Sequence, residues 1–566
     1  MYILGIWDGH NAGAALIDNT SIIFAADEER FTKRKLEVGF PKNAIEASLK
    51  FAGIKPADVE IAAYSTTEFT KALERIFPSM RESYYQFRRR KILKPHFEGL
   101  RHQIKYAMTS IGNVPCSKAI SNAIISKQLK SMGFRNFRLF AIEHHMAHAA
   151  TAAYTSPFND SLVVTLDGLG DGISATLSTF GKNGIERKKA IGAKDSLGIF
   201  FEQVTNIVGM RELEDEGKVM AMADYSYPFK FEENRLKGFF SVEGTSIKAK
   251  YSPAKQYSLL CRIAWQMPRE QFSYMAQQLL EVSLSRFIHN AVKEYGNGDV
   301  AMAGGTFSNV KANMVIRNDE SIKHWYIFPH MGDGGMALGA AMQANFLVNG
   351  TKKYKMNAYL GPEYGEDETL KALRNGKKMK YSKDGDPAGH AAELISKGNY
   401  LFWFQGRMEY GPRALGNRSI LAPSGSEEVK DKLNVYVKKR EWFQPFAPSI
   451  IEEDVPKILY FDGKGFDKYM TMAYMVKEEK RDIAKSVMHV DGSARPQMVG
   501  SENPEYKNLI EKVKKNEGAG IVLNTSFNIH GMPIVMDPED AVETMKKTRT
   551  RYMFINGFFV ENEDGV

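Results

Sequence analysis

The sequence has almost no cysteine. Cys116 and Cys261 are the only thiols in 566 residues, too few for a disulfide framework or a metal cluster built from cysteine. A chain with so few thiols is typical of a reducing compartment, so we expect a cytoplasmic protein.

Long apolar runs are missing as well. The apolar residues 1–7 are interrupted by Asp8-Gly9-His10, which gives them neither the length of a membrane span nor the layout of a signal peptide. The net charge of +9 is modest for this length, and its densest part is the basic run 88–91, preceded by aromatic residues within 84–87. Such a run is more often a solvated helix face than a patch for an acidic partner. We therefore expect neither a membrane nor a nucleic-acid partner.

The Gly-x-x-x-x-Gly-Lys-Ser loop is also absent, which excludes the phosphate-loop enzymes. The composition is that of an ordinary globular protein, with 43% apolar and 25% charged residues. A chain this long exceeds one hydrophobic core. The turn-rich stretch 354–368 marks a boundary, and we predict two domains, at 1–355 and 356–566.

The first domain contains a weak internal repeat. Short strands are predicted at 2–7, 14–17 and 22–26, and again at 161–166 and 175–180, and the first turn of each set is acidic and contains glycine. Helical sequence follows each set. We predict an α/β fold with a duplicated unit, a layout that resembles the actin, hexokinase and heat-shock ATPase superfamily. Two further glycine turns supply candidate nucleotide contacts, at Gly304, Gly305 and Gly334.

The same domain offers a metal site and a base. His144 and His148 are four residues apart, so they share one face of a helix, and Asp167 and Asp333 in glycine turns are plausible partners. The alternative is a helix with ordinary histidines. Two imidazoles with two carboxylates would suit iron, zinc or manganese. His10 is a candidate general base or a simple turn residue.

Lys218 of the triplet Glu-Gly-Lys could place a cation on a nucleotide, although an isolated triplet is more often a plain surface turn.

The second domain is rich in groups that bind anions. A loop at 406–419 alternates arginine with glycine directly after the apolar segment 400–404, and arginine binds phosphate in a two-pronged way. A Lys-x-Arg pair and a distant Ser-x-Asn pair add cations and neutral hydrogen-bonding groups. The alternative is a surface ion-pair network. The candidate residues are Arg413, Arg418, Lys438, Arg440, Arg495, Asn524, Ser526 and Asn528.

Several longer motifs carry a family resemblance. They are Asp-Glu-Glu-Arg-Phe-Thr-Lys-Arg-Lys at 27–35, His144-x-x-x-His148, Glu-Gly-Lys at 216–218, Gly-Pro-Arg-Ala-Leu-Gly at 411–416, Pro-Phe-Ala-Pro at 445–448, Ala-Arg-Pro-Gln at 494–497 and Asn-Thr-Ser-Phe-Asn at 524–528. On these motifs the chain is identified as a member of the NodU/CmcH O-carbamoyltransferase family. Its first domain is similar to the tRNA threonylcarbamoyltransferase and its second to YrdC-like domains. Gln444 and Asn11 depart from the arginine and aspartate usual in the family.

The resemblance implies a two-step reaction. The YrdC-like domain would form carbamoyl adenylate from carbamoyl phosphate and ATP with Mg²⁺, and the first domain, with a divalent metal such as Fe²⁺, would pass the carbamoyl group to a hydroxyl of a small molecule. Two other functions stay open: a metal-dependent ATPase or kinase of the actin-hexokinase type with a regulatory C-terminal module, and a non-catalytic sensor of carbamoyl phosphate or nucleotide. Neither the acceptor nor the oligomeric state can be read from the sequence, which leaves a homodimer open.

Overall fold

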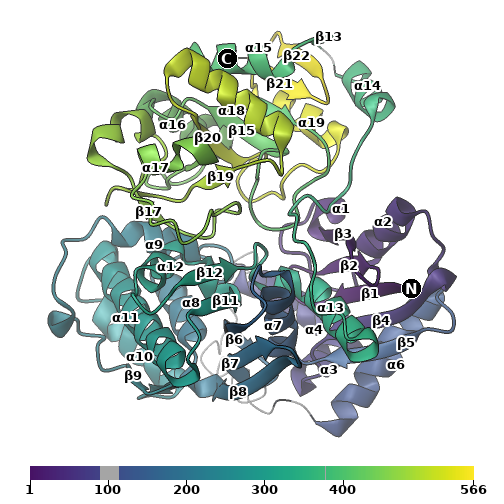
Figure 1. Cartoon of the computed structure of the whole chain (residues 1–566), viewed down its shortest axis with the longest axis vertical. Helices are drawn as coiled ribbons and strands as arrows, with labels where there is room; N and C mark the ends of the chain where they lie inside the picture. Colours follow the sequence, from purple (N-terminus) through teal and green to yellow (C-terminus); the bar gives the residue numbers. More distant parts are fainter. Residues whose placement is uncertain (90–111, 113, 377, 566) are drawn as a thin grey trace. The chain divides into compact units, whose positions relative to one another are not determined.

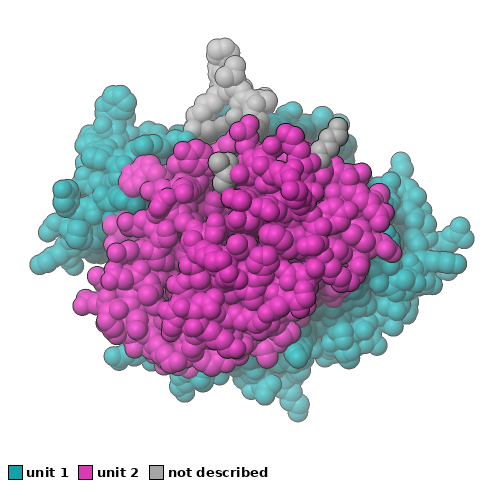
Figure 2. Space-filling model, turned by 90° about the horizontal axis from the view of Figure 1, so that it is seen from above, with its two compact units in different colours: residues 1–28, 37–356 teal, residues 29–36, 357–566 magenta. Residues whose placement is uncertain are grey.

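The chain forms two compact units. The computed structural model describes residues 1–89, 112, 114–376 and 378–565. Unit 1 contains Met1–Glu28 and Glu37–Met356, and unit 2 contains Glu29–Leu36 and the chain from Asn357 onward (Figure 2). The short segment 29–36 therefore belongs to unit 2 although it lies near the start of the sequence, whereas the predicted domains were contiguous.

Unit 1 is built on two five-stranded sheets with the same topology (Figure 1). In each sheet the first three strands form an antiparallel meander. The fourth strand pairs in parallel with the first, and the fifth pairs in parallel with the fourth. The first sheet has the order β3-β2-β1-β4-β5, with β1 (Tyr2–Trp7), β2 (Gly13–Ile17), β3 (Ile22–Asp27), β4 (Val59–Ser65) and β5 (Arg138–Ile142). The second has the order β8-β7-β6-β11-β12, with β6 (Ser161–Gly170), β7 (Ile173–Gly181), β8 (Gly184–Gly192), β11 (Asp299–Ala303) and β12 (His324–Ile327). The predicted duplication and α/β class are confirmed.

Two helices lie between these sheets. Helix α13 (Met336–Asn349) packs on the first sheet, α7 (His144–Thr155) packs on the second, and the two helices pack on each other. Gly5 and Gly339 permit this close approach, because a Cβ at Gly5 would meet the Ala337 carbonyl oxygen at 1.9 Å and one at Gly339 would meet the Ala147 oxygen at 2.1 Å. The histidine pair on α7 is thereby fixed in the interior of the unit.

Further helices and a hairpin complete unit 1. They are α2 (Lys42–Ala52), α3 (Phe69–Ile76), α4 (Pro78–Arg88), α6 (Pro115–Ser131), α8 (Leu197–Ile207), α9 (Glu216–Ala223), α10 (Pro253–Ala264), α11 (Arg269–Tyr295), α12 (Val310–Arg317), β9 (Phe240–Glu243) and β10 (Ser246–Ala249). The basic run begins at the end of α4, and residues 90 and 91 lie outside the described residues. Arg89 is buried and pairs with Glu214 at 3.4 Å, so the prediction of a solvated basic face is wrong at that residue. Among the helices of the described ranges, none is long and apolar enough to cross a bilayer.

Unit 2 is built on one mixed eight-stranded sheet. Its order is β13-β22-β21-β14-β15-β20-β16-β19, with β13 (Met379–Lys383), β14 (Leu401–Phe404), β15 (Arg418–Ala422), β16 (Ala447–Ile451), β19 (Gln497–Val499), β20 (Ile521–Ser526), β21 (Tyr552–Ile555) and β22 (Phe558–Asn562). Strand β20 lies between β15 and β16 and is antiparallel to both. The other elements are α1 (Glu29–Thr32), α14 (Glu366–Arg374), α15 (Pro387–Ser396), α16 (Glu427–Lys432), α17 (Val455–Ile458), α18 (Pro504–Glu517), α19 (Pro538–Thr548), β17 (Tyr474–Met475) and β18 (Ser493–Ala494).

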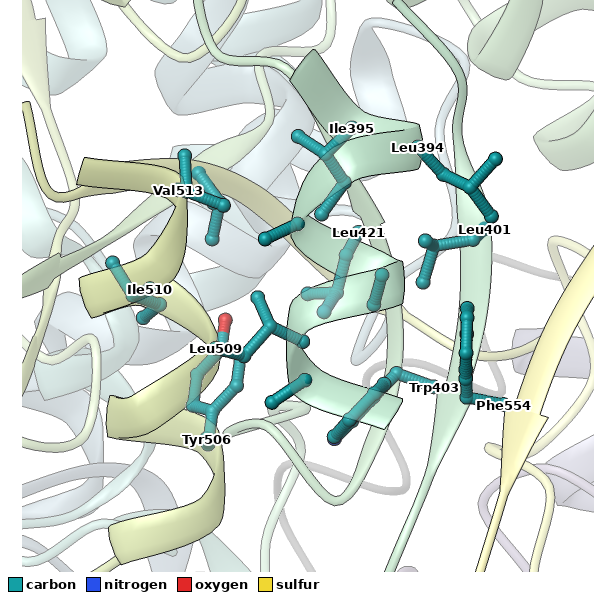
Figure 3. Close-up of a cluster of buried hydrophobic side chains, with 14 of the residues drawn as sticks. Leu394, Ile395, Leu401, Trp403, Leu421, Tyr506, Leu509, Ile510, Val513 and Phe554 are labelled. Atoms are coloured by element: carbon teal, nitrogen blue, oxygen red, sulfur yellow. The ribbon is translucent and has the colours of Figure 1, made fainter. Parts of the chain in front are cut away.

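Helices α15 and α18 cover the sheet of unit 2 with an apolar core (Figure 3). Each begins at a side-chain cap followed by proline at the first helical position, Asp386 for α15 and Asn503 for α18. Their apolar faces bury Leu394 and Leu509, among others, against Trp403 of β14. This core holds the strands whose ends carry the polar site described below.

Candidate active sites in the two units

The predicted metal residues of unit 1 converge on one point. Glu143 caps helix α7 by accepting hydrogen bonds from the backbone N–H groups of His145 and Met146, and the rings of His144 and His148, one turn apart, have centroids separated by 4.9 Å. Each of His144, His148, Asp167 and Asp333 offers a ligand atom within 4.8 Å of the others.

Distances within this His–Asp cluster suit a shared cation. His144 Nε2 lies 3.2 Å from Asp167 Oδ2 and 3.7 Å from Asp333 Oδ1, and His148 Nε2 lies 3.9 and 3.6 Å from the same two oxygens. His148 Nε2 and Asp333 Oδ1 are buried and have no hydrogen-bond partner. Buried polar atoms are rarely left unpaired, so these orphaned atoms fit a bound divalent metal.

Electrostatics in the cluster favour a positive charge between the two carboxylates. Burial would lower the pKa of His144, but Asp333 and Asp167 outweigh burial and raise the pKa to about 10. Burial acts against ionisation of the two carboxyls, yet the histidines hold the pKa of Asp167 well below its ordinary value, and His10 helps to lower that of Asp333. Without a metal, His144 thus holds a proton between the two carboxylates, and a bound metal ion would displace that proton.

His145, between the two ligands in sequence, has a different role. Its Nδ1 lies 2.8 Å from Thr165 Oγ1 and its Nε2 lies 2.9 Å from the Ile173 carbonyl oxygen. Burial and the neighbouring histidines push the pKa of His145 well below its ordinary value, so this ring is a neutral link between α7 and the second sheet.

His10 lies beside the cluster. Its Nε2 is 3.2 Å from Asp333 Oδ2, while its Nδ1 is buried without a hydrogen-bond partner. The backbone of this turn is held because Trp7 Nε1 donates a hydrogen bond of 2.7 Å to the His10 carbonyl oxygen. Asp333 therefore faces the α7 histidines with one oxygen and His10 with the other.

The two acidic turns of the repeat differ in function. Asp167 faces the cluster and also accepts a hydrogen bond of 2.8 Å from the Gly305 N–H. Asp8, its counterpart in the first half, is instead buried against Arg75 at 2.8 and 2.9 Å, and although burial opposes ionisation, Arg75 and Lys71 lower the pKa of Asp8 far below its usual range. Of these two turns, only the one with Asp167 supplies a carboxylate to the His–Asp cluster.

The predicted nucleotide contacts of unit 1 occupy tight turns. Gly304 has φ +111°, and a Cβ there would meet the Leu166 carbonyl oxygen at 2.1 Å. A Cβ at Gly334 would meet the His330 ring at 2.0 Å. Lys218 is buried in the first turn of α9 and forms an ion pair of 2.9 Å with Asp215. These contacts explain the residue types by packing and ion pairing, and nucleotide binding by them stays a prediction.

Unit 2 brings the Lys-x-Arg and Ser-x-Asn pairs together. Lys438 is 2% exposed and ends a π-helical turn at Leu433–Lys438, a rare backbone form often found at functional sites. Its ammonium donates hydrogen bonds to Ser526 Oγ at 3.1 Å and Asn528 Oδ1 at 2.8 Å, and also to the Ser526 carbonyl oxygen. Lys439 then takes a left-handed φ of 49°, which ends the π-helical turn just before Arg440.

The cations of unit 2 repel one another. Burial and the charges of Arg440 and Lys35 push the pKa of Lys438 well below its ordinary value. Burial and then Arg413 do the same to Arg495, and burial lowers the pKa of Arg413 and of Arg440 to about 10. Within the described part of the chain, none of these four candidate residues forms an ion pair. A bound phosphate would supply the missing negative charge.

Two predicted anion ligands of unit 2 have other partners. Arg418 is fully buried, stacks on Phe404 at 3.5 Å, and donates to the backbone carbonyls of Gln405, Gly406 and Asn417 and, at 3.2 Å, of Met536. Asn524 is 1% exposed and donates to three neighbouring oxygens. Their contacts favour structural roles. Arg440 is partly held in the same way, because it donates a hydrogen bond of 2.7 Å to Asn434 Oδ1 and lies over the Phe446 ring at 4.3 Å.

Lys35 is a cation of unit 2 that sequence reasoning did not assign. Its segment, 29–36, packs within unit 2: Arg30 donates a 3.0 Å hydrogen bond to the Gly411 carbonyl oxygen, and Phe31 packs with Met408 and Met536. Only the position of Lys35 in the family motif at 27–35 could have pointed to it, because no local pattern predicts that these residues join the C-terminal unit.

Comparisons with known proteins agree with this architecture. The family model described as Carbamoyltransferase N-terminus matches residues 2–342, and that described as Carbamoyltransferase C-terminus matches residues 392–562. The chain is 36% identical to the uncharacterized protein MJ1058 of Methanocaldococcus jannaschii, over 78% of this chain and 77% of that protein. It is 30% identical to nodulation protein NolNO of Sinorhizobium fredii, over 98% and 79%. It is 33% identical to the 3'-hydroxymethylcephem-O-carbamoyltransferase of Streptomyces clavuligerus, over 48% and 51%.

Both family models describe parts of a group-transfer protein, and together they cover most of the chain. The chain belongs to the carbamoyltransferase family, which confirms the resemblance carried by its motifs.

Proposed function

We propose that this chain is an O-carbamoyltransferase that makes carbamoyl adenylate in unit 2 and uses it in unit 1. The observation that carries the proposal is a group of four cations that form no ion pair among the described residues and that repel one another, Lys438, Arg413, Arg440 and Arg495. Such a group is strained until a polyanion binds. Carbamoyl phosphate and MgATP together supply that charge.

In the first step one water is consumed, and phosphate and pyrophosphate are released for each carbamoyl adenylate that forms. Arg413, Arg440 and Arg495 would neutralise phosphate charge as it develops. Lys438, held by Ser526 and Asn528, would bind the carbamoyl or phosphate oxygens.

In the second step the hydroxyl oxygen of a small-molecule acceptor would bond to the carbamoyl carbon, and AMP would leave. His10 would take the hydroxyl proton, since its ring lies at the edge of the cluster and is partly exposed. A divalent metal on His144, His148, Asp167 and Asp333, for which we favour Fe²⁺, would act there as a Lewis acid. A cytoplasmic location, where ATP and carbamoyl phosphate occur together, is part of the proposal.

The test is incubation of the protein with carbamoyl phosphate and MgATP, followed by assay of pyrophosphate and mass spectrometry of carbamoyl adenylate. The proposal expects both products without any acceptor. ADP as the sole nucleotide product would instead favour an ATPase or kinase, and binding without turnover would favour a sensor.

A further inference from the structure

A buried pair joins the two halves of unit 1 close to the His–Asp cluster. Asp27 is the last residue of β3 in the first sheet, and His330 follows β12 of the second sheet. His330 Nε2 lies 2.9 Å from Asp27 Oδ1, and the two residues are only 3% and 2% exposed. A polar contact this deep is costly unless its geometry is good, so the two halves are held together at a defined point.

The histidine end of the pair shapes the turn that carries Asp333. Gly334 packs against the His330 ring, where a Cβ would meet ring atoms at 2.0 Å, and a Cβ at Gly335 would meet the His330 carbonyl oxygen at 2.5 Å. The same turn is tied to the second sheet because the Gly304 N–H donates to the Met331 carbonyl oxygen at 2.7 Å. The chain from 330 to 335 is therefore folded around the imidazole, and Asp333 lies within that fold.

The aspartate end of the pair is tied to the turn that carries His10. Asp27 pairs with Gly13 in the sheet, and the Glu28 N–H donates to the Ala12 carbonyl oxygen at 2.7 Å. His10 in turn lies 3.2 Å from Asp333. Two side-chain pairs, Asp27 with His330 and His10 with Asp333, thus cross between the same two halves of unit 1.

We infer that Asp27 and His330 are positioning residues for Asp333. By fixing the turn, the pair directs one oxygen of Asp333 to the α7 histidines and the other to His10. The effect of this pair on metal binding rests on the metal site in the proposed function, and its effect on carbamoyl transfer rests on the second step of that function. Outer residues that orient a metal ligand typically change metal affinity by about 10- to 100-fold.

The test uses the full-length chain and Co²⁺, whose visible spectrum reports ligand geometry. In His330→Leu we expect the Co²⁺ dissociation constant to rise at least ~10-fold and the spectrum to change. His330→Gln, which can still donate to Asp27, should recover part of the affinity. The matched control is His289→Leu, which breaks another His–Asp pair of 2.9 Å, with Asp319, and should leave Co²⁺ binding unchanged. Pyrophosphate release by unit 2 should be unaffected in all three variants.

The outcomes separate the two ideas. If His330→Leu and wild type bind Co²⁺ with equal affinity and identical spectra, the positioning role is refuted while the metal site stands. If wild type itself binds no Co²⁺, the metal site and the positioning role both fail. Should His330→Leu not fold, Asp27→Asn has nearly the same shape and serves the same comparison, with the same result overturning the inference.

Discussion

Two arginines of unit 2, replaced by the same residue, should have opposite effects. Arg495 is half-buried, its Nε has no hydrogen-bond partner, and Arg413 repels it. Arg495→Met removes a cation that the ligand-free protein does not need, so we expect an unchanged or higher melting temperature. Loss of one charged hydrogen bond should weaken carbamoyl phosphate binding by about 1.5 to 3 kcal/mol, or roughly 10- to 150-fold.

Arg418→Met should instead destabilise the fold. The side chain donates to the carbonyls of Gln405, Gly406, Asn417 and Met536, and leaving a buried carbonyl unpaired costs about 1 to 3 kcal/mol. With several carbonyls affected, the total should be at least ~3 kcal/mol. For a unit of about 200 residues this corresponds to a fall in melting temperature of roughly 6 to 12 °C.

The assay pairs calorimetric melting with titration of fresh carbamoyl phosphate into each variant. Arg413→Met is a third variant that should follow Arg495→Met, because it too has no ion-pair partner within the described residues. The reasoning is refuted if Arg495→Met melts as low as Arg418→Met and still binds carbamoyl phosphate like wild type.

Three further predictions concern the division between the units and the metal site. Lys438→Ala should abolish pyrophosphate release while His148→Ala spares it; the reverse pattern would mean that the two steps are assigned to the wrong units. Gly170→Ala should lower bound metal measured by mass spectrometry, since its Cβ would meet the His144 ring at 2.1 Å, whereas Gly192→Ala, with open space around the Cβ, should not. The carboxylates outweigh burial and raise the pKa of His144 from 6.5 to about 10. The stabilisation of the metal-free protein by this charged pair should therefore be complete below pH 6.5 and disappear as the pH rises to about 10, while Co²⁺ affinity rises over the same range. A melting temperature and a Co²⁺ affinity that do not change with pH would contradict this.

Local pattern was enough to predict the framework of unit 1. Each meander begins with a short apolar strand that ends in an acidic turn, so the repeat is visible without long-range information. The four-residue spacing of His144 and His148 fixes their common helix face, and Asp167 and Asp333 could be named because both lie in glycine turns. The structure brings these four side chains together.

What the sequence could not reveal is which partner each charged group meets. Asp8 and Asp167 occupy equivalent turns, but Arg75, 67 residues after Asp8, neutralises only the first. Arg413 and Arg418 lie in one loop with the same chemistry nearby, and they differ because β15 begins at Arg418 and carries it into the core. Pairings of this kind depend on tertiary contacts that leave no local periodicity.

The two sites have opposite electrostatic imbalances. In unit 1, two carboxylates face the α7 histidines and raise the pKa of His144 to about 10. In unit 2, Lys438 is buried among cations that repel one another, and Lys35 of segment 29–36 adds a further positive charge beside it. The cation group reduces the stability of ligand-free unit 2, and a phosphate ligand recovers that free energy when it binds the folded state. Binding of a phosphate therefore relieves the repulsion between these cations, and the same cations can stabilise the negative charge that develops on the phosphate during transfer.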